Sequence, residues 1–216
     1  MQVTLLSSLP GGEIRYTTDN SVPTLHSTLY AGMLSIKGTT TLKALLFDKR
    51  KQMTGRLFQQ HIRIHKAVGA PVVVKNKPVD RFNPGAEALV NGVFGGNRYN
   101  DSQWLGFSGS DLDAVIDLGA VQTIHRLGLH VLNYHWQRMW APVSIQWLAS
   151  TDGEHFTELC RQDSFPRNGI NVLDVPVKPA SARYIKIIGI NKGIIPAGEY
   201  GAGGNALLLI DEIIVE

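Results

Sequence analysis

The most constraining feature of the chain is a succession of short runs in which apolar and polar residues alternate, separated by turn-forming residues. Ile14–Thr18 and Gln60–Ile64 alternate in this way, which is typical of β-strands with one buried face. Strand-like runs continue through the second half of the chain, over Ala114–Leu118, Ile124–Leu132, Val143–Leu148, Arg183–Ile190 and Leu207–Val215. No long segment has a convincing helical period, so the sequence predicts an all-β protein made of β-sandwiches.

Charge divides the chain into two segments of opposite sign. Residues 1–66 carry nine Lys/Arg and three Asp/Glu, whereas residues 67–216 carry twelve Lys/Arg and fifteen Asp/Glu. A sign change of this kind indicates two modules, and we place the joint at Lys66–Pro71, where small residues and a proline follow a strand-like run. The total of +3 is too weak to indicate nucleic-acid binding, and the basic first module is interpreted as a solvated face.

The apolar runs are short. The longest, such as Ala206–Ile210, cannot span a bilayer, so no membrane span is expected. Met1–Leu9 lacks the basic start and long apolar stretch of a signal peptide. If the protein is exported, we expect the export signal to lie upstream of Met1.

The first segment resembles a known module. Residues 14–24 read IRYTTDNSVPT, and Leu42–Ala44 follows at a matching position. These residues are similar to the small Ig-like module that follows the catalytic barrel in chitobiases and family 20 β-hexosaminidases. The resemblance covers residue 1 to about residue 66.

The second segment resembles another module over a longer stretch. The runs that carry the resemblance are, in order, Ala88–Gly92, Asp101–Phe107, Asp113–Gly119, Ser150–Phe156 and Ile210–Ile213. They are similar to the discoidin module, also called the coagulation factor 5/8 C-terminal type, a jelly-roll sandwich whose fold is shared by family 32 carbohydrate-binding modules. The resemblance covers residue 67 to the end.

Together the two resemblances imply the non-catalytic tail of a bacterial family 20 β-N-acetylhexosaminidase, located in the periplasm, on the outer surface or outside the cell. They imply a spacer module followed by a module that binds glycans ending in N-acetylhexosamine or galactose. The catalytic domain of the same parent chain would be a further partner. The alternative is a structural module that docks on the catalytic barrel without binding sugar.

Catalysis by the chain itself is disfavoured. Asp211–Glu212 is the only adjacent pair of carboxylates, and on a regular strand successive side chains point to opposite faces. Two carboxylates on opposite faces cannot flank one glycosidic bond. The histidines show no zinc spacing, and no Gly-x-Ser-x-Gly motif is present.

Three predicted loops combine aromatic residues with polar ones: residues 97–100, 133–140 and 196–200. Because binding residues concentrate on loops held by a rigid scaffold, and binding loops of discoidin folds cluster at one end, we expect a sugar site there. Its candidate residues are Arg98, Tyr99, Asn133, Trp136, Trp140 and Tyr200. Trp136 and Tyr200 either bind sugar or cover the core, whereas Trp104 and Trp147 are expected within the core. Related tails often have a Trp-His pair where Glu199–Tyr200 stands, which leaves the bound sugar open.

The resemblance also implies a structural calcium ion near the junction of the module's termini. Calcium binds six to eight oxygen ligands. The matching residues are Ala88, Asn91, Ser102 and Glu212. The family commonly has Asp at the position of Asn91, so a weaker site is expected, and an ordinary Asn-Gly turn without an ion is the alternative.

Overall fold

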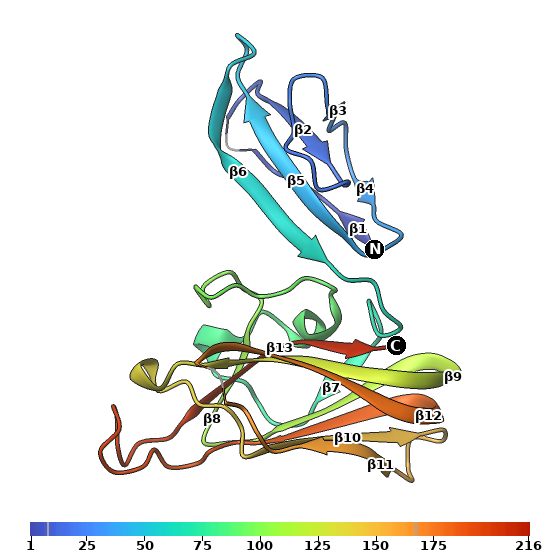
Figure 1. Ribbon diagram of the computed structural model, residues 1–216, viewed down its shortest axis with the longest axis vertical. Helices are drawn as coiled ribbons and strands as arrows, with labels where there is room; N and C mark the ends of the chain where they lie inside the picture. The colour runs from blue at the N-terminus through green and yellow to red at the C-terminus, as the bar shows by residue number, and fades with distance from the viewer. Residues whose placement is uncertain (8, 167) are drawn as a thin grey trace. The chain divides into compact units, whose positions relative to one another are not determined.

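The computed structural model describes residues 1–7, 9–166 and 168–216, and shows an all-β chain (Figure 1). Contacts between residues divide the chain into two compact units, Met1–Ile64 and His65–Glu216. The expected all-β class is confirmed. Each unit is described by itself below.

The first unit has a four-stranded antiparallel sheet in the order β3-β2-β5-β6 and a two-stranded sheet of β1 and β4. The strands are β1 (Gln2–Val3), β2 (Glu13–Thr17), β3 (Thr28–Leu29), β4 (Leu34–Ser35), β5 (Thr40–Phe47) and β6 (Met53–Ile62). Ile36, Leu42 and Ile62 form its buried core. A turn follows β2, with Asn20 at φ 68° and the Ser21 N–H group donating to Asp19 Oδ1 at 3.0 Å. Asn tolerates this left-handed backbone better than most residues.

The second unit contains the remaining elements. Its strands are β7 (Val72–Val74), β8 (Leu105–Ser108), β9 (Leu112–Asn133), β10 (Ser144–Ser150), β11 (Thr157–Gln162), β12 (Gly169–Ile190) and β13 (Leu207–Val215). Three short 3₁₀ turns accompany them: η1 (Asp80–Phe82), η2 (Ala86–Val90) and η3 (His135–Gln137). The strands pair in the order β11-β10-β12-β9-β13-β8, and β7 pairs with β9.

Two long strands organise this unit, and here the structure corrects the sequence expectation. Ala114–Leu118 and Ile124–Leu132 were expected as separate strands, but both belong to β9, and Arg183–Ile190 is only the end of β12. The ends of β9 pair with different neighbours, because Ala114–Ile116 pairs with β7 and Leu127–Leu132 pairs with β13. Register shifts interrupt the β9–β12 ladder near its middle. Such irregularities bend strands, which is consistent with the two ends of β9 pairing with different neighbours.

The largest cluster of buried apolar residues lies in this unit. It draws on both halves of β9 and β12 through Ile116, Leu129, Ala182 and Ile187, all buried. Trp104 and Trp147 are buried, which confirms that both are core residues. Within the described ranges, no helix is long and apolar enough to cross a membrane.

Candidate functional site

The loop that precedes β8 and the loop that follows β9 meet through aromatic rings. The Tyr99 ring lies 6.2 Å from the Tyr134 ring in an edge-on arrangement, and the Tyr134 ring lies 4.8 Å from that of Trp136. The Tyr134 hydroxyl donates to Asn97 Oδ1 at 3.3 Å. Trp136 is 52% exposed, and Arg98 is exposed next to Tyr99 in the chain. These rings form a continuous, partly exposed aromatic surface.

The loop that precedes β13 joins this surface through Arg138. The Arg138 guanidinium lies 5.8 Å from the centre of the Tyr200 ring, and Tyr200 is 65% exposed. Gly201 permits this approach, because a Cβ atom there would lie 2.4 Å from Arg138 Nε. Of the six predicted sugar-binding residues, Tyr99 and Trp136 thus both contact Tyr134, and Tyr200 lies near Arg138 of the same loop.

Asn133 and Trp140 occupy a different position. They are only 7% and 8% exposed, and the Trp140 ring is stacked on His135 at 3.8 Å. The Lys192 ammonium group lies 5.9 Å from the centre of the same ring. Both residues line a hollow of about 370 Å³ with His135, Asp163, Phe165 and Lys192. A ring contacted by histidine and lysine offers little free surface to a sugar.

Sequence reasoning did not select Tyr134 and Arg138 as site residues, although both lie in a loop that it singled out. Tyr134 connects the rings of Tyr99 and Trp136. Arg138 has a left-handed φ of 62° at the end of η3, which turns the loop sharply. The only sequence signal was the composition of residues 133–140, which does not reveal which members face one another.

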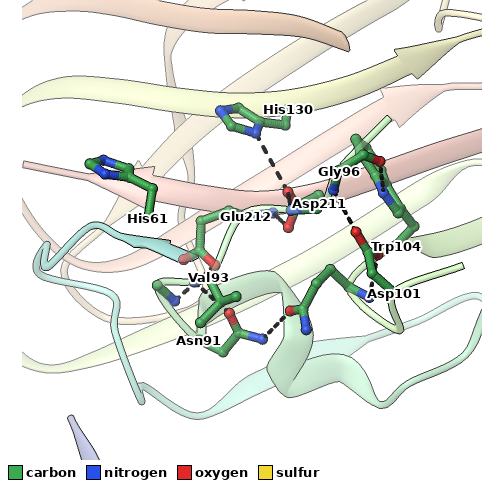
Figure 2. Close-up of polar contacts among 12 residues, drawn as sticks. His61, Asn91, Val93, Gly96, Asp101, Trp104, His130, Asp211 and Glu212 are labelled. Carbon is green, nitrogen blue, oxygen red and sulfur yellow. Dashed lines mark hydrogen bonds and ion pairs between the residues drawn. The ribbon is translucent and has the colours of Figure 1, made fainter. Parts of the chain in front are cut away.

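A second polar cluster lies inside the unit, around Asp211 and Glu212 (Figure 2). Both carboxylates are fully buried. Asp211 Oδ2 accepts the Gly95 N–H group at 2.5 Å, and Glu212 Oε2 accepts that of Gly92 at 2.9 Å. The expectation of opposite faces is therefore wrong, because both side chains reach the same loop. A register shift between Asp211 and Ile213 in the β9–β13 ladder breaks the alternation, as a β-bulge does.

Histidines contact both acids. His65 Nε2 lies 2.8 Å from Glu212 Oε1, and both side chains are fully buried. His130 Nδ1 lies 3.5 Å from Asp211 Oδ2, and its ring packs against Phe94 with ring centres 4.3 Å apart. Burial raises the pKa of the Glu212 carboxyl to about 9, against the opposing effect of the Gly92 N–H group.

The predicted calcium ligands lie partly in this cluster. Asn91 caps the end of η2, which contains Ala88, and its chain neighbour Gly92 bonds Glu212. The Asn91 side chain bonds within its own loop, because Nδ2 donates to Gln103 Oε1 at 2.8 Å and Oδ1 accepts the Val93 N–H group at 2.7 Å. Ser102 lines a separate hollow of about 400 Å³ with Phe82 and Tyr99. Among the described residues, no group of three or more His, Cys, Asp or Glu is placed to hold a metal ion.

The fold and the loop surface define a protein of two β-sandwich modules, the second with an aromatic surface on three converging loops. Family models agree with this division. Residues 1–58 match the model described as the chitobiase/β-hexosaminidase C-terminal domain, and residues 77–209 match that of the F5/8 type C domain. The second match covers more than half of the chain, so the chain belongs to the F5/8 type C domain family. Comparison with curated proteins gives no significant match.

Solved structures with a similar fold include several carbohydrate-binding modules. Chitosan-binding module 1 from a chitosanase/glucanase of Paenibacillus sp. IK-5 is 16% identical, with a TM-score of 0.47, 71% of this chain covered and 99% of that one. A fucose-binding module of Streptococcus pneumoniae is 15% identical, with a TM-score of 0.49 and 71% and 97% covered. A family 32 module in complex with 4,5-unsaturated mannuronic acid is 19% identical, with a TM-score of 0.45 and 68% and 93% covered.

Proposed function

We propose that the second unit binds the terminal sugar of a glycan, N-acetylhexosamine or galactose, on the surface formed by Tyr99, Tyr134, Trp136, Arg138 and Tyr200. The observation that carries the proposal is the exposed Trp136 ring beside the Tyr99–Tyr134 pair. An aromatic face packs against the apolar C–H face of a pyranose, and nearby polar groups orient its hydroxyls. Asn97, Arg98 and Arg138 supply such groups on the same loops.

The affinity for a single sugar is expected to be weak, with a Kd of about 1 mM, because a shallow surface buries little of the ligand. Tethering to an enzyme that acts on the same polymer raises the effective concentration of the sugar, so weak contacts suffice for targeting.

Titration of the labelled chain with oligosaccharides ending in N-acetylglucosamine or in galactose, followed by backbone amide shifts, tests the proposal. Shifts should concentrate in residues 97–100, 134–138 and 196–204. If no amide of these loops moves at tens of millimolar sugar, the proposal fails and the docking function below is preferred.

The parent protein in this proposal is an exo-acting β-N-acetylhexosaminidase of an exported bacterial type, and the first unit is its spacer. The family match over residues 1–58 supports this assignment. The gene region upstream of Met1 provides the test, because it should encode a family 20 catalytic barrel and an export signal.

The chain itself is proposed to have no hydrolase activity. Asp211 and Glu212 are buried, and their oxygens already accept hydrogen bonds from the loop of Gly92 and Gly95. A general acid must reach the glycosidic oxygen within hydrogen-bond distance. Purified chain should therefore release no chromophore from a chromogenic N-acetylglucosaminide. Turnover that is lost in Glu212→Gln would contradict this.

A docking function is the second candidate, and an apolar groove in the first unit favours it. Leu6, Leu45 and Phe58 line this hollow of about 410 Å³ together with Arg56, and Leu6 and Phe58 are exposed. Exposed apolar patches mark interaction surfaces. Calorimetric titration of the chain with the separately purified catalytic domain tests this function, because Phe58→Asp should abolish binding to that domain.

A further inference from the structure

The cluster around Glu212 directs hydrogen-bond donors at both acidic side chains, although the resemblance to discoidin modules implies a cation there. We infer that this module closes its termini without calcium, and that His65 and the N–H groups of Gly92 and Gly95 take the place of the ion. The inference rests on which atoms face the two buried carboxylates, and it does not depend on sugar binding.

The loop that follows η2 turns its amide groups toward the acids. The N–H groups of Gly92 and Gly95 donate to Glu212 Oε2 and Asp211 Oδ2 at 2.9 and 2.5 Å. Figure 2 shows Val93 and Asn91 beside the Glu212 carboxylate. Calcium requires six to eight oxygens directed inward, whereas successive N–H groups directed inward form a nest for anions. A cation at this point would face the positive ends of these dipoles.

The other carboxylate oxygen of Glu212 is also occupied. Glu212 Oε1 lies 2.8 Å from His65 Nε2, and the Ala67 N–H group donates to His65 Nδ1 at 3.3 Å. Because Nδ1 accepts, Nε2 carries the hydrogen that Glu212 accepts. The Glu212 Oε1 atom, which would otherwise be free to bind the ion, therefore already accepts a hydrogen bond from buried His65, the first residue of the unit.

The side chains of Asn91 and Ser102, which were also predicted as ligands, do not complete a coordination shell. Asn91 Oδ1 is directed to Val93 N and its amide to Gln103. Ser102 lines the hollow that contains Phe82 and Tyr99. The side chains present thus do not fit a calcium ion.

The hydrogen bonds of this cluster join segments of the unit to β13, as a bound ion would. His65 joins the start of the unit to β13, and the backbone supports this junction because Lys66 N–H donates to the Val215 carbonyl at 2.8 Å. Gly92 and Gly95 join the loop after η2 to the same strand. Two separate segments are thereby fixed on β13 by groups that the chain itself supplies.

Thermal unfolding of the full chain in about 5 mM calcium and in about 5 mM EGTA tests the inference. A native-state site held at about 100 times its Kd would raise the Tm by roughly 5 to 10 °C. We expect equal Tm values, no calcium in the dialysed protein by elemental analysis, and no tryptophan-sensitised terbium luminescence from this site. Glu212→Gln should lower the Tm by the same amount in both buffers.

A calcium-dependent rise in the Tm of the wild-type chain that disappears in Glu212→Gln overturns the inference. If that variant does not fold, elemental analysis and terbium titration of the wild-type chain decide instead. Stoichiometric calcium that terbium displaces would likewise overturn the inference. A rise that persists unchanged in Glu212→Gln assigns the ion to another place and supports the inference for this cluster.

Discussion

Individual side chains of the proposed sugar-binding surface differ in exposure. We expect exposed rings to bind sugar and buried rings to stabilise the fold. Trp136→Ala removes a ring that is 52% exposed. We expect sugar affinity to fall by about fivefold, since stacking contributes on the order of 1 kcal/mol, with an unchanged Tm. Amide-shift titration and thermal unfolding of the same samples measure both effects.

Phe58→Ala is the matched control for Trp136→Ala, because Phe58 is 46% exposed and lies in the first unit. It should leave sugar affinity unchanged. Equal losses in the two variants would show that the Trp136 effect is not specific to the loop surface.

Trp140 should behave in the opposite way, because its ring is buried against His135. Trp140→Ala should reduce the free energy of unfolding by about 3 kcal/mol, as large-to-small core substitutions do, and weaken binding only through loss of fold. Denaturant unfolding measures the stability. Loss of sugar binding without loss of stability would instead indicate that Trp140 contacts the sugar.

Pairs of strands are held together by specific side chains as well as by their ladders. Arg183 lies where the β9–β12 register shifts, between Ala182 and Tyr184, and donates to both oxygens of Asp117 at 2.9 Å. These bonds lower the pKa of the Asp117 carboxyl to about 2. The pair therefore fixes the strand region in which the ladder is irregular.

Asp117→Asn should lower the Tm at neutral pH. A depressed carboxyl pKa contributes stability above the unfolded value of about 4, and that contribution disappears as the pH falls toward the folded value of about 2. The Tm difference between wild type and variant should thus shrink from pH 5 to about pH 2. A difference that stays constant across this range would contradict the ion pair as its cause. Asp174→Asn, which removes the exposed partner of Arg126, is the control and should have a smaller effect.

The division of the whole chain gives a prediction about fragments. The sequence placed the joint after Lys66, whereas the structure divides the chain between Ile64 and His65. A fragment of residues 67–216 lacks His65 and leaves Glu212 buried without its partner. We expect it to be less stable than residues 65–216 by roughly 2 kcal/mol, because a buried acceptor left without its donor costs about 1–3 kcal/mol.

Denaturant unfolding of the two fragments measures this difference, and His65→Ala in the longer fragment should reproduce most of it. Lys66→Ala is the control, because its backbone bond to Val215 does not need the side chain. Equal stability of the two fragments would show that His65 does not belong to the second unit.

The sequence alone determined the fold class, the two modules and the loops that carry the candidate site. Period-two alternation and turn residues act locally, so they can be recognised without tertiary contacts. The tandem family pattern identified both modules, and apolar neighbours placed Trp104 and Trp147 in the core, where the structure has them.

Tertiary structure decided everything that depends on which segments meet. Alternation predicted opposite faces for Asp211 and Glu212, but the bulge that turns both toward one loop arises from pairing with β9. Composition grouped Trp136 with Trp140, and only packing separated an exposed ring from a buried one. His65 and Glu212 lie 147 residues apart, so their contact has no local signal. A fold brings such groups together through long-range packing, and their environment then sets their chemistry.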